Sequence, residues 1–324
     1  MKLCSIQPIK VEEIKPNGNI CKCNKDAVYD KLCKEHYCEY IEKKLLNTIN
    51  KFGMFKKDKI LVAFSGGKDS TVLLYIMNKL GFNVEAITLN AYIGCYSKEN
   101  VEIAKQFCEE QNITLHHISF RDEFGYSLCY LRTLLHKKGV NLKSCTICGV
   151  LRRYLLNKKA REMKATKIAF GHNMDDEVQS ILMNFMKGNL ETAARIGPVT
   201  GISKEKQFVQ RVKPLYLISE QEVILYSKIK QFPVKYEKCP CSTDSYRYFL
   251  RSIINNYESQ NPNAKKNTIH IFLKILPYLK EKFKSSKHPN MCKRCGEPTS
   301  SDLCRTCSIL SNVINYGSSI SKKQ

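Results

Sequence analysis

Short apolar runs alternate with segments of helical periodicity along residues 46–285. The runs that we expect to form strands are Ile60–Phe64, Val84–Leu89, Thr114–Ile118 and Lys167–Phe170. The segments that we expect to form helices between them are Thr71–Leu80, Lys98–Gln111 and Gly149–Met163. Regular alternation of strand and helix is typical of an α/β fold with a doubly wound parallel sheet. Such a sheet binds ligands at the carboxyl ends of its strands.

The regions on either side of this α/β core are distinguished by their cysteines. Residues 1–45 and 286–312 each contain a short Cys-rich segment, and we expect each to form a small metal-binding module. The last residues, 313–324, are polar, and we expect them to form a frayed tail. The pattern therefore predicts a catalytic domain at 46–285 between two appended modules.

A glycine-rich turn, Ser65–Ser70, lies between the first predicted strand and the first predicted helix. The adjacent residues Gly66 and Gly67 allow a tight turn in which successive backbone N–H groups converge on one anion. The following helix start and Lys68 add positive charge, so a phosphate or pyrophosphate is the expected ligand. The spacing matches neither GxxxxGK[ST] nor GxGxxG. An ordinary Gly-Gly turn is the alternative.

The bulk composition favours a globular protein without a membrane span. The chain has 324 residues, of which 43% are hydrophobic, enough for one sizeable core. No run of about 18 apolar residues occurs, and the first residues lack the apolar segment of a signal peptide. We therefore expect a cytoplasmic protein.

The charge balance indicates a polyanionic partner. Lys and Arg number 53 against 30 Asp and Glu, a formal net charge of +23. Nucleic acid is the simplest partner for such a surplus, although a lysine-rich proteome would also produce it. Basic residues recur throughout the chain, so we expect a folded basic surface rather than a basic arm.

Sixteen cysteines in a cytosolic chain point to metals or sulfur chemistry rather than to structural disulfides. The clearest set, two CxxC turns eight residues apart, is Cys292, Cys295, Cys304 and Cys307. Four thiolates close a zinc tetrahedron and leave no open position, so this zinc should be structural. A looser Cys3His zinc set is Cys21, Cys23, Cys33 and His36, with Cys4 and Cys38 as alternative ligands.

A third group of cysteines lies inside the core. Cys145 and Cys148 directly precede the helix expected from Gly149, and Cys239 and Cys241 follow far along the chain. The helix N-terminus and neighbouring basic residues should favour thiolates at Cys145 and Cys148. A closed zinc site needs four ligands and would therefore use both Cys239 and Cys241 with the CxxC pair. Only three cysteine ligands would instead leave an open position on a metal or cluster. A buried, redox-inert CxxC is the alternative.

Longer motifs resemble one family. Ser65–Ser70 resembles the PP-loop of the ATP pyrophosphatases, whose fold is HUP-like. Three further segments resemble the TtuA-type (TtcA/TtuA superfamily) tRNA 2-thiouridine synthetases, and these are Cys145–Asn157 with Gly171–Glu177, Val212–Tyr216, and Cys239–Ser242 with Arg247 and Arg251. The resemblance covers nearly the whole chain, including an N-terminal zinc finger and a C-terminal zinc ribbon.

The resemblance implies an enzyme, a tRNA sulfurtransferase that converts ATP to AMP and pyrophosphate. ATP adenylates the 2-oxygen of a tRNA uridine, and sulfur then displaces AMP. A [4Fe-4S] cluster held by Cys145, Cys148 and Cys239 would carry the sulfur on its fourth iron. The base must leave its stack to meet ATP and sulfur together.

The resemblance also assigns the nucleotide and catalytic residues. Asp176 and Arg152 are the expected catalytic residues beside the three cysteines. Asp175 and Asp176 could hold Mg²⁺ or orient the nucleotide, or they could simply be first-turn helix acids. The expected nucleotide-binding residues are Ser65, Gly66, Gly67, Lys68, Asp69, Ser70, Gly171, His172 and Asp175. Arg247 and Arg251, four residues apart on a helix face, could bind phosphate of ATP or tRNA.

Some segments depart from the family pattern. Leu89–Cys95 lacks the acidic residues of many relatives, and the N-terminal CxC is tighter than usual. Cys241 is an additional thiol, so either Cys239 or Cys241 could be the third cluster ligand.

Several functions remain open at this point. A cysteine persulfide could replace the cluster, another PP-loop ligation could use the adenylate, and a zinc-ribbon RNA-binding protein is the non-enzymatic alternative. The resemblance favours the wobble uridine over the T-loop uridine and implies a homodimer. The sulfur donor could be sulfide, a persulfide carrier or a ubiquitin-like thiocarboxylate.

Overall fold

The computed structural model describes residues 14–55, 58–201, 208–237, 239–242, 246–284 and 290–320. Cys4, one of the alternative N-terminal ligands, lies outside these residues. Among the described helices, none combines the length and the apolar character that crossing a membrane requires.

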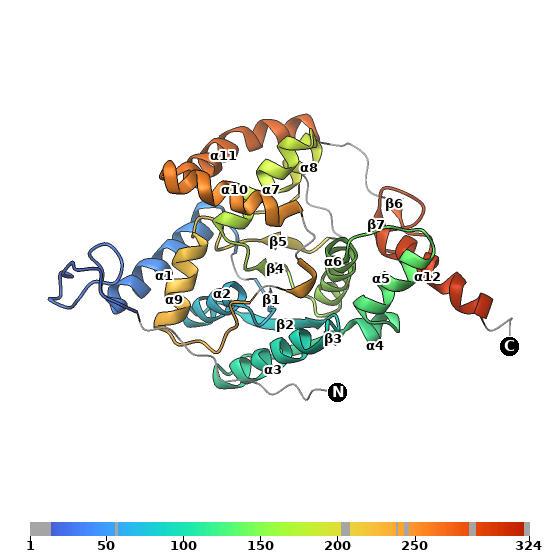
Figure 1. The fold of residues 1–324 in the computed structure, drawn as a ribbon, viewed down its shortest axis with the longest axis horizontal. Helices are drawn as coiled ribbons and strands as arrows, with labels where there is room; N and C mark the ends of the chain where they lie inside the picture. The colour runs from blue at the N-terminus through green and yellow to red at the C-terminus, as the bar shows by residue number, and fades with distance from the viewer. Residues whose placement is uncertain are drawn as a thin grey trace.

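A parallel sheet of five strands in the order β3-β2-β1-β4-β5 forms the centre of the fold (Figure 1). The strands are β1 Ile60–Ala63, β2 Val84–Asn90, β3 Leu115–Ser119, β4 Lys167–Phe170 and β5 Gln210–Val212. The doubly wound parallel sheet and the four strands predicted from the sequence are confirmed. The fifth strand, β5, was not predicted, because three residues are too few to show a periodicity.

Twelve α-helices are described around the sheet. They are α1 Lys34–Lys51, α2 Lys68–Lys79, α3 Gly94–Glu110, α4 Phe120–Phe124, α5 Leu128–Lys137, α6 Ser144–Glu162, α7 Met174–Met186, α8 Leu190–Arg195, α9 Glu220–Ile229, α10 Tyr246–Gln260, α11 Ala264–Lys282 and α12 Arg305–Ile320. A short 3₁₀ helix, η1, covers Pro240–Ser242, and a small hairpin pairs β6 Asn290–Met291 with β7 Pro298–Thr299.

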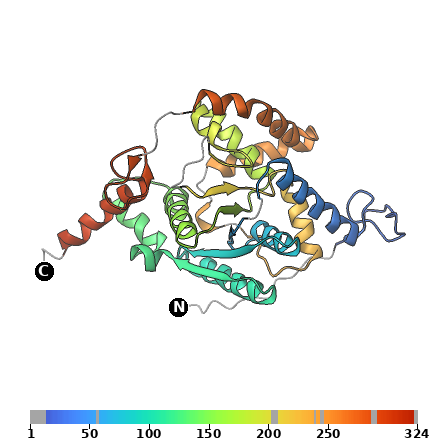
Figure 2. The same cartoon turned by 180° about the vertical axis from the view of Figure 1, so that it is seen from behind.

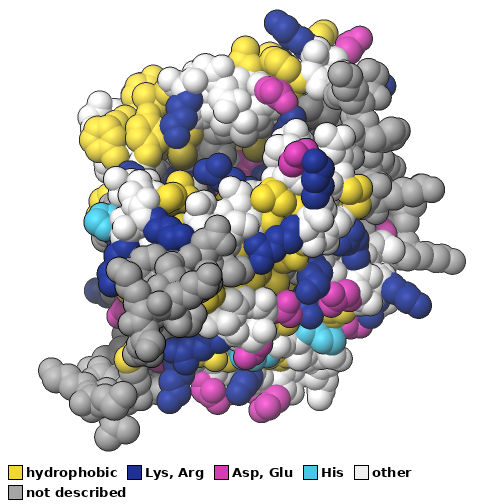
Figure 3. Space-filling model, turned by 90° about the vertical axis from the view of Figure 1, so that its right-hand side faces the viewer, with side chains coloured by type: hydrophobic (Ala, Val, Ile, Leu, Met, Phe, Trp, Pro, Cys, Tyr) yellow, Lys and Arg dark blue, Asp and Glu magenta, His cyan; other side chains and the backbone are white. Residues whose placement is uncertain are grey.

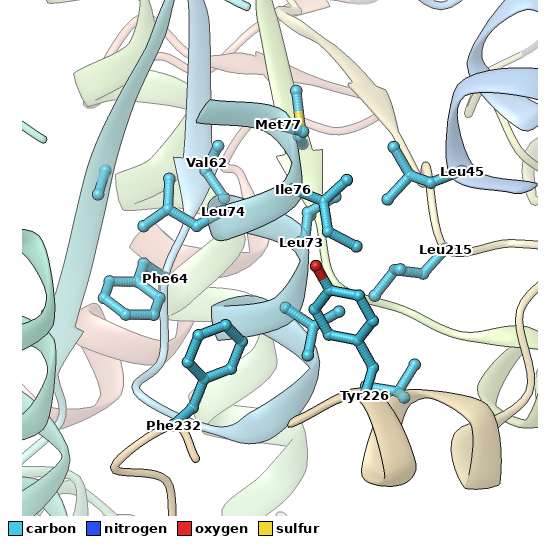
Figure 4. Close-up of a cluster of buried hydrophobic side chains, with 14 of the residues drawn as sticks. Leu45, Val62, Phe64, Leu73, Leu74, Ile76, Met77, Leu215, Tyr226 and Phe232 are labelled. Carbon is cyan, nitrogen blue, oxygen red and sulfur yellow. The ribbon is translucent and has the colours of Figure 1, made fainter. Parts of the chain in front are cut away.

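Alternation along β1 divides the core between the two faces of the sheet. Ile60 and Val62 join a buried cluster that includes α1, α2, α3 and α9, and part of this cluster is shown in Figure 4. Leu61 points to the other face, where Leu156 and Ala160 of α6 cover it. Successive strand residues face opposite ways, so a continuous apolar run is what a strand buried on both faces requires.

Helices α7, α8, α10 and α11 form a layer of their own beyond β5, at the top of Figure 1. Their shared cluster includes Val178 and Ile181 of α7 with Phe272 and Leu276 of α11. The same layer is visible from behind in Figure 2. Helices α7 and α10 therefore lie beyond the sheet edge while their N-termini approach the strand ends.

Two segments differ from the regions expected from the sequence. Residue 45, expected to end the N-terminal module, lies inside α1, whose Tyr37, Ile41 and Leu45 belong to the main core. Helix α12 continues to Ile320, so residues 313–320 are helical rather than a frayed tail. Ile309 and Val313 of α12, one turn apart, are buried against α5 and α6, and this packing stabilises the helix.

The C-terminal module is joined to α6 by a buried carboxylate. Glu297 is 7% exposed and accepts a hydrogen bond of 3.1 Å from Asn157 Nδ2. Arg161, one turn further along α6, forms an ion pair with the same carboxylate. Helix α6, which contains Cys145 and Cys148 near its start, is thus attached to the C-terminal module through its second half.

We predict that Glu297→Gln lowers the free energy of unfolding by about 1–3 kcal/mol. The amide keeps an oxygen for Asn157 but leaves the Arg161 guanidinium without its counter-charge. Urea unfolding measures the change. The control is Glu162→Gln, which removes a carboxylate of α6 that is 47% exposed. This substitution should change the free energy of unfolding by less than about 0.5 kcal/mol. Equal effects of the two substitutions would contradict the anchoring role of Glu297.

Candidate active site

The site lies where the order of the strands reverses. Strand β1 is followed in the sheet by β2 on one side and by β4 on the other, and the chain crosses between these halves. Ligands of open α/β sheets bind in the crevice that such a reversal creates at the carboxyl ends of the strands. Ser65–Ser70 follows β1 and Gly171–Asp176 follows β4, so both predicted motifs border this crevice.

The turn Ser65–Ser70 is held by its own side chains. Ser70 Oγ accepts from the backbone N–H of Ser65 at 3.2 Å and donates to Gly67 O at 3.0 Å. Gly66 has φ +75°, and a Cβ there would lie 2.5 Å from Asn100 O of α3. Helix α2 begins at Lys68, slightly earlier than predicted. The backbone N–H groups at this helix start are therefore available to an anion.

Gly171 brings the ends of β4 and α2 into direct contact. A Cβ at Gly171 would lie 2.9 Å from Asp69 C and from Ser70 N, both backbone atoms. Only a residue without a side chain permits this approach. The sequence motif that contains Gly171 is thus required for the shape of the turn that follows β1.

We expect Gly171→Ala to weaken ATP binding about tenfold or more, because overpacking against backbone costs about 1–3 kcal/mol and displaces the turn. Isothermal titration with ATP measures the change. Gly139→Ala is not a suitable control, because Gly139 has φ +73°, and a side chain there would strain the backbone. Ala169→Gly, inside β4, alters the same strand without crowding Asp69 and Ser70. Unchanged ATP affinity in Gly171→Ala would contradict this prediction.

Charged side chains from three helices, together with Asn173 at the start of α7, meet beside the turn. Lys68 Nζ lies 2.8 Å from Asp69 Oδ2 and 3.0 Å from Glu220 Oε1 of α9. Arg251 of α10 pairs with Glu220, and Asn173 Nδ2 donates to Asp69 Oδ1 at 2.8 Å. Burial opposes a charged Lys68, but Asp69 and Glu220 raise its pKa overall. Burial raises the pKa of Asp69, and Lys68 opposes that rise.

Asp175 and Asp176 have different surroundings, although they are adjacent in α7. Asp175 Oδ1 lies 2.6 Å from Lys265 Nζ, and its Oδ2 accepts from the backbone N–H of Glu220 at 2.8 Å. Asp176 faces Arg247, whose Nη1 is 3.6 Å away. Burial raises the pKa of Asp176, and Arg247 opposes this rise. Asp175 is thus held in contacts between helices, whereas Asp176 is next to the turn and to Arg247.

His172 is stacked on Phe170, with ring centroids 5.6 Å apart. Its Nδ1 is buried and has no hydrogen-bond partner among the described residues. Burial, with Lys213 next in effect, lowers the pKa of His172 to about 4. The imidazole is therefore neutral at pH 7.

One pocket joins the turn after β1 to the cysteines of the core. Its volume is about 350 Å³, and the residues that line it include Ser65, Asn100, Arg152, Cys145, Cys148, Cys239 and Cys241. Leu89, Ile93, Val101 and Leu128 provide apolar walls. The structure therefore brings Ser65 together with all three predicted cluster ligands, which lie far apart in the sequence.

The two cysteines of the CxxC lie inside α6 rather than before it. The helix begins at Ser144, five residues before the predicted start, because the backbone N–H of Ile147 already bonds to Lys143 O. Cys145 Sγ donates to Cys241 O at 3.2 Å, and Arg152 Nε donates to Cys148 Sγ at 3.1 Å.

Cys239 and Cys241, the two core cysteines that follow far along the chain, are partly buried. This burial raises the pKa of both thiols. For Cys239 the N–H of Cys241 opposes that rise, whereas for Cys241 the neighbouring Cys239 adds to it.

Both terminal cysteine sets converge as predicted. The ligand atoms of Cys21, Cys23, Cys33 and His36 all lie within 4.8 Å of one another, and so do those of Cys292, Cys295, Cys304 and Cys307. The Sγ atoms of Cys295 and Cys304 are 3.6 Å apart. Sulfurs about 2.3 Å from one tetrahedral zinc ion are separated by about 3.8 Å, so the spacing fits this metal.

Sequence reasoning missed Glu220, which connects Lys68 to Arg251. The Ser219–Glu222 capping box is visible in the sequence and indicates the start of α9. Nothing in the sequence indicates that this helix start faces Lys68. Arg247 and Arg251, predicted to share a helix face, do so on α10 and reach Asp176 and Glu220 respectively.

Comparison with known proteins agrees with this architecture. The model of the PP-loop domain family matches residues 38–257. A tRNA-5-methyluridine(54) 2-sulfurtransferase of Pyrococcus horikoshii is 34% identical over 306 residues, covering 91% of this chain and 96% of the relative. The tRNA 2-thiolation protein NcsA of Haloferax volcanii is 29% identical, and the match covers 90% of this chain and 98% of that protein.

A solved structure extends the similarity to three dimensions. The U34-tRNA thiolase NcsA of Methanococcus maripaludis, solved with its [4Fe-4S] cluster, superposes with a TM-score of 0.76 at 29% identity. The match covers 93% of this chain and 97% of the thiolase. The glycine-rich turn after β1, the pocket shared with the core cysteines and the full-length matches lead to one conclusion: this chain belongs to the PP-loop family, among the tRNA 2-sulfurtransferases and 2-thiolation proteins of TtuA and NcsA type.

Proposed function

We propose that this protein is an ATP-dependent tRNA 2-thiouridine synthetase. ATP would adenylate the 2-oxygen of a tRNA uridine, and sulfur would then displace AMP from the same carbon. The observation that carries this proposal is the pocket that Ser65 shares with Cys145, Cys148 and Cys239. Both half-reactions need their groups close together, and the proposal is supported because Ser65 of the expected nucleotide turn lines the same pocket as the expected sulfur ligands.

The residues beside the turn would bind the nucleotide. The N–H groups of Ser65–Ser70 and the start of α2 would bind phosphate, with Lys68 adding a full charge. Gly171 and His172 would border the nucleotide at the end of β4. Asp69 and Asp176, which are half-buried and close to Lys68, would hold Mg²⁺ through carboxylate oxygens. Asp175 would then contribute by orienting the start of α9, where Glu220 contacts Lys68.

The core cysteines fit a [4Fe-4S] cluster. Cys145, Cys148 and Cys239 face one cavity of about 350 Å³, and thiolates are the ligands that such clusters require. When bound by three cysteines, the cluster supplies one iron without a protein ligand, which can carry sulfide. Cys145 and Cys148, in the first turn of α6, hold fixed positions, and Arg152 orients the Cys148 thiolate through its Nε–H.

Arg152 is placed to act on the developing charge of the reaction. Its side chain lines the pocket between the cysteines and Ser65. A guanidinium there would stabilise negative charge on the uridine oxygen and on the α-phosphate during adenylation. Asp176, next to Arg247 and to the turn, is the residue we assign to metal and substrate orientation. These roles need no movement of the backbone.

The two terminal cysteine sets would each hold a structural zinc ion. Although burial raises it, backbone N–H groups led by that of Cys304 lower the pKa of Cys292 to about 6, which favours the thiolate. Four convergent ligands leave no open position for a substrate. The C-terminal zinc would keep the module around Glu297 folded against α6.

The partner would be tRNA, the molecule that the similar sulfurtransferases and thiolation proteins modify. Figure 3 shows Lys and Arg side chains spread over the face that includes the right-hand side of Figure 1, in keeping with the net charge of +23. We favour the wobble uridine, because the superposed relative is a U34-tRNA thiolase. We further propose cytoplasmic action and a homodimer, with sulfide, a persulfide carrier or a thiocarboxylate as the sulfur donor.

The decisive experiment is nucleoside mass spectrometry of tRNA incubated anaerobically with the reconstituted protein, ATP, Mg²⁺ and sulfide. We expect new 2-thiouridine, and nuclease fragments would show whether it lies at the wobble position or in the T-loop. AMP without sulfur would indicate another adenylate-driven modification. Thiolation without bound iron would favour a cysteine persulfide, and tRNA binding without AMP would favour an RNA-binding protein.

A further inference from the structure

Two arginines lie together on the α6 side of the sheet, outside the residues assigned above. Arg211 of β5 donates from Nη2 to the backbone O of Arg153 at 3.4 Å. The Arg153 guanidinium lies against Gly149, where a Cβ would be 3.2 Å from its Nη1. Gly149 directly follows Cys148, so this arginine pair is adjacent to the cysteine site.

Neither guanidinium has a carboxylate partner among the described residues. In the site, Lys68 pairs with Asp69 and Glu220, and Arg251 pairs with Glu220, whereas Arg152 donates to Cys148 Sγ. Burial and the adjacent Arg153 lower the pKa of Arg211 to about 10. The surrounding protein also lowers the pKa of Arg153, chiefly by desolvation, although this residue is exposed on the surface. Both side chains stay charged at pH 7, so two like charges are close together without an anion between them.

A second observation comes from the aromatic residues beside Arg211. The Arg211 guanidinium lies 6.0 Å from the Phe170 ring centroid, and His172 stacks on the same ring. Among the described residues, His172 Nδ1 is one of four buried side-chain nitrogen or oxygen atoms without a hydrogen-bond partner. Buried polar atoms without partners are rare in folded proteins. The surplus charge and the unpartnered nitrogen therefore flank the same aromatic ring.

We propose that Arg153 and Arg211 bind a backbone phosphate of the RNA substrate next to the reacting uridine. This inference rests on the proposed function. Guanidinium groups match phosphate oxygens with two parallel hydrogen bonds, and a phosphate would supply the missing counter-charge. The phosphates of ATP already have the N–H groups of Ser65–Ser70 and Lys68.

The test measures binding rather than catalysis. Wild type, Arg211→Gln, Arg153→Gln and the double variant are titrated with unmodified tRNA transcript by fluorescence anisotropy at several salt concentrations, and with ATP by calorimetry. We expect each single variant to lose about tenfold in tRNA affinity and to reduce the salt slope by about one. ATP affinity should stay within about twofold of wild type. Arg211→Lys keeps the charge and should preserve the slope but lose affinity.

Arg195→Gln is the matched control, because Arg195 is 60% exposed and already paired with Glu191. It should leave both affinities unchanged. Thermal unfolding and the thiol content of each variant check that the fold is intact. Loss of ATP affinity with unchanged tRNA binding would assign the pair to the nucleotide and overturn the proposal, as would unchanged binding of both. If wild type itself does not bind tRNA, the proposed function fails rather than this site.

Discussion

Cys148→Ala should lose both bound iron and 2-thiouridine formation while keeping its affinity for ATP. Cys148 lines the pocket beside Cys145 and Cys239, and two remaining thiolates cannot hold a cluster that needs three. Loss even of an outer contact weakens metal binding about 10–100-fold, so loss of a ligand should exceed that. Iron and acid-labile sulfide, determined after anaerobic reconstitution, measure the first effect, and nucleoside mass spectrometry measures the second.

Two further cysteine substitutions make this prediction specific. Cys108→Ala removes a buried thiol of α3 that has no role in the site, and it should retain iron and activity. Cys239→Ala should behave like Cys148→Ala, whereas Cys241→Ala should keep the cluster. The reverse order would assign the third ligand to Cys241. Full thiolation by an iron-free Cys148→Ala protein would contradict the cluster and also the persulfide alternative at this residue.

Lys68→Met should lower kcat/KM for AMP formation about 10²–10³-fold, the usual effect of removing one donor from a developing anion. Lys68 is held by Asp69 and Glu220 at the start of α2, where a phosphate would meet the backbone N–H groups. Its removal deletes the full charge but leaves the turn and the cysteines in place. Iron content should therefore stay at the wild-type value. The rate of AMP release in the presence of tRNA is the measurement.

Lys79→Met provides the control at the other end of the same helix. Lys79 Nζ lies 2.7 Å from Glu42 Oε1 and is far from the turn along α2. Lys79→Met removes a lysine–carboxylate ion pair of the same helix at a more exposed lysine, so a general effect of charge loss on α2 appears in both variants. If Lys68→Met also loses its iron or unfolds, Lys68 serves the fold rather than the nucleotide. If it keeps full activity, the phosphate site lies elsewhere.

Much of the fold was predictable because buried parallel strands have a direct signature. Ile60–Ala63 and Lys167–Phe170 are apolar on both faces and are separated by helical periodicity. The short strand β5, Gln210–Val212, and the early start of α6 at Ser144 were not predictable. A strand of three residues shows no period, and the first turn of α6 is determined by backbone hydrogen bonds to Lys143.

The site was predictable to the extent that its chemistry is local. A glycine-rich turn after a strand, two CxxC turns and a Cys3His set combine ligands that are close in sequence, and the structure brings each set together. The contacts between segments that lie far apart in the sequence could not be predicted. Glu220 on Lys68, Arg161 on Glu297 and Arg211 beside Arg153 join residues that no spacing rule relates.

The sequence by itself therefore determined the fold class and the two terminal sets of convergent ligands, and it predicted the phosphate turn and the core thiols. These features depend on periodicity and on neighbours within a few residues, which a sequence states directly. Only the tertiary structure decided that Ser65 shares one pocket with Cys145, Cys148, Cys239 and Cys241, and that Asp175 is held between helices while Asp176 faces Arg247. It also decided that Arg153 and Arg211 have no carboxylate partner among the residues that the structure describes. Burial and pairing across distant segments depend on how the helices pack over the sheet, and that packing follows from the whole chain.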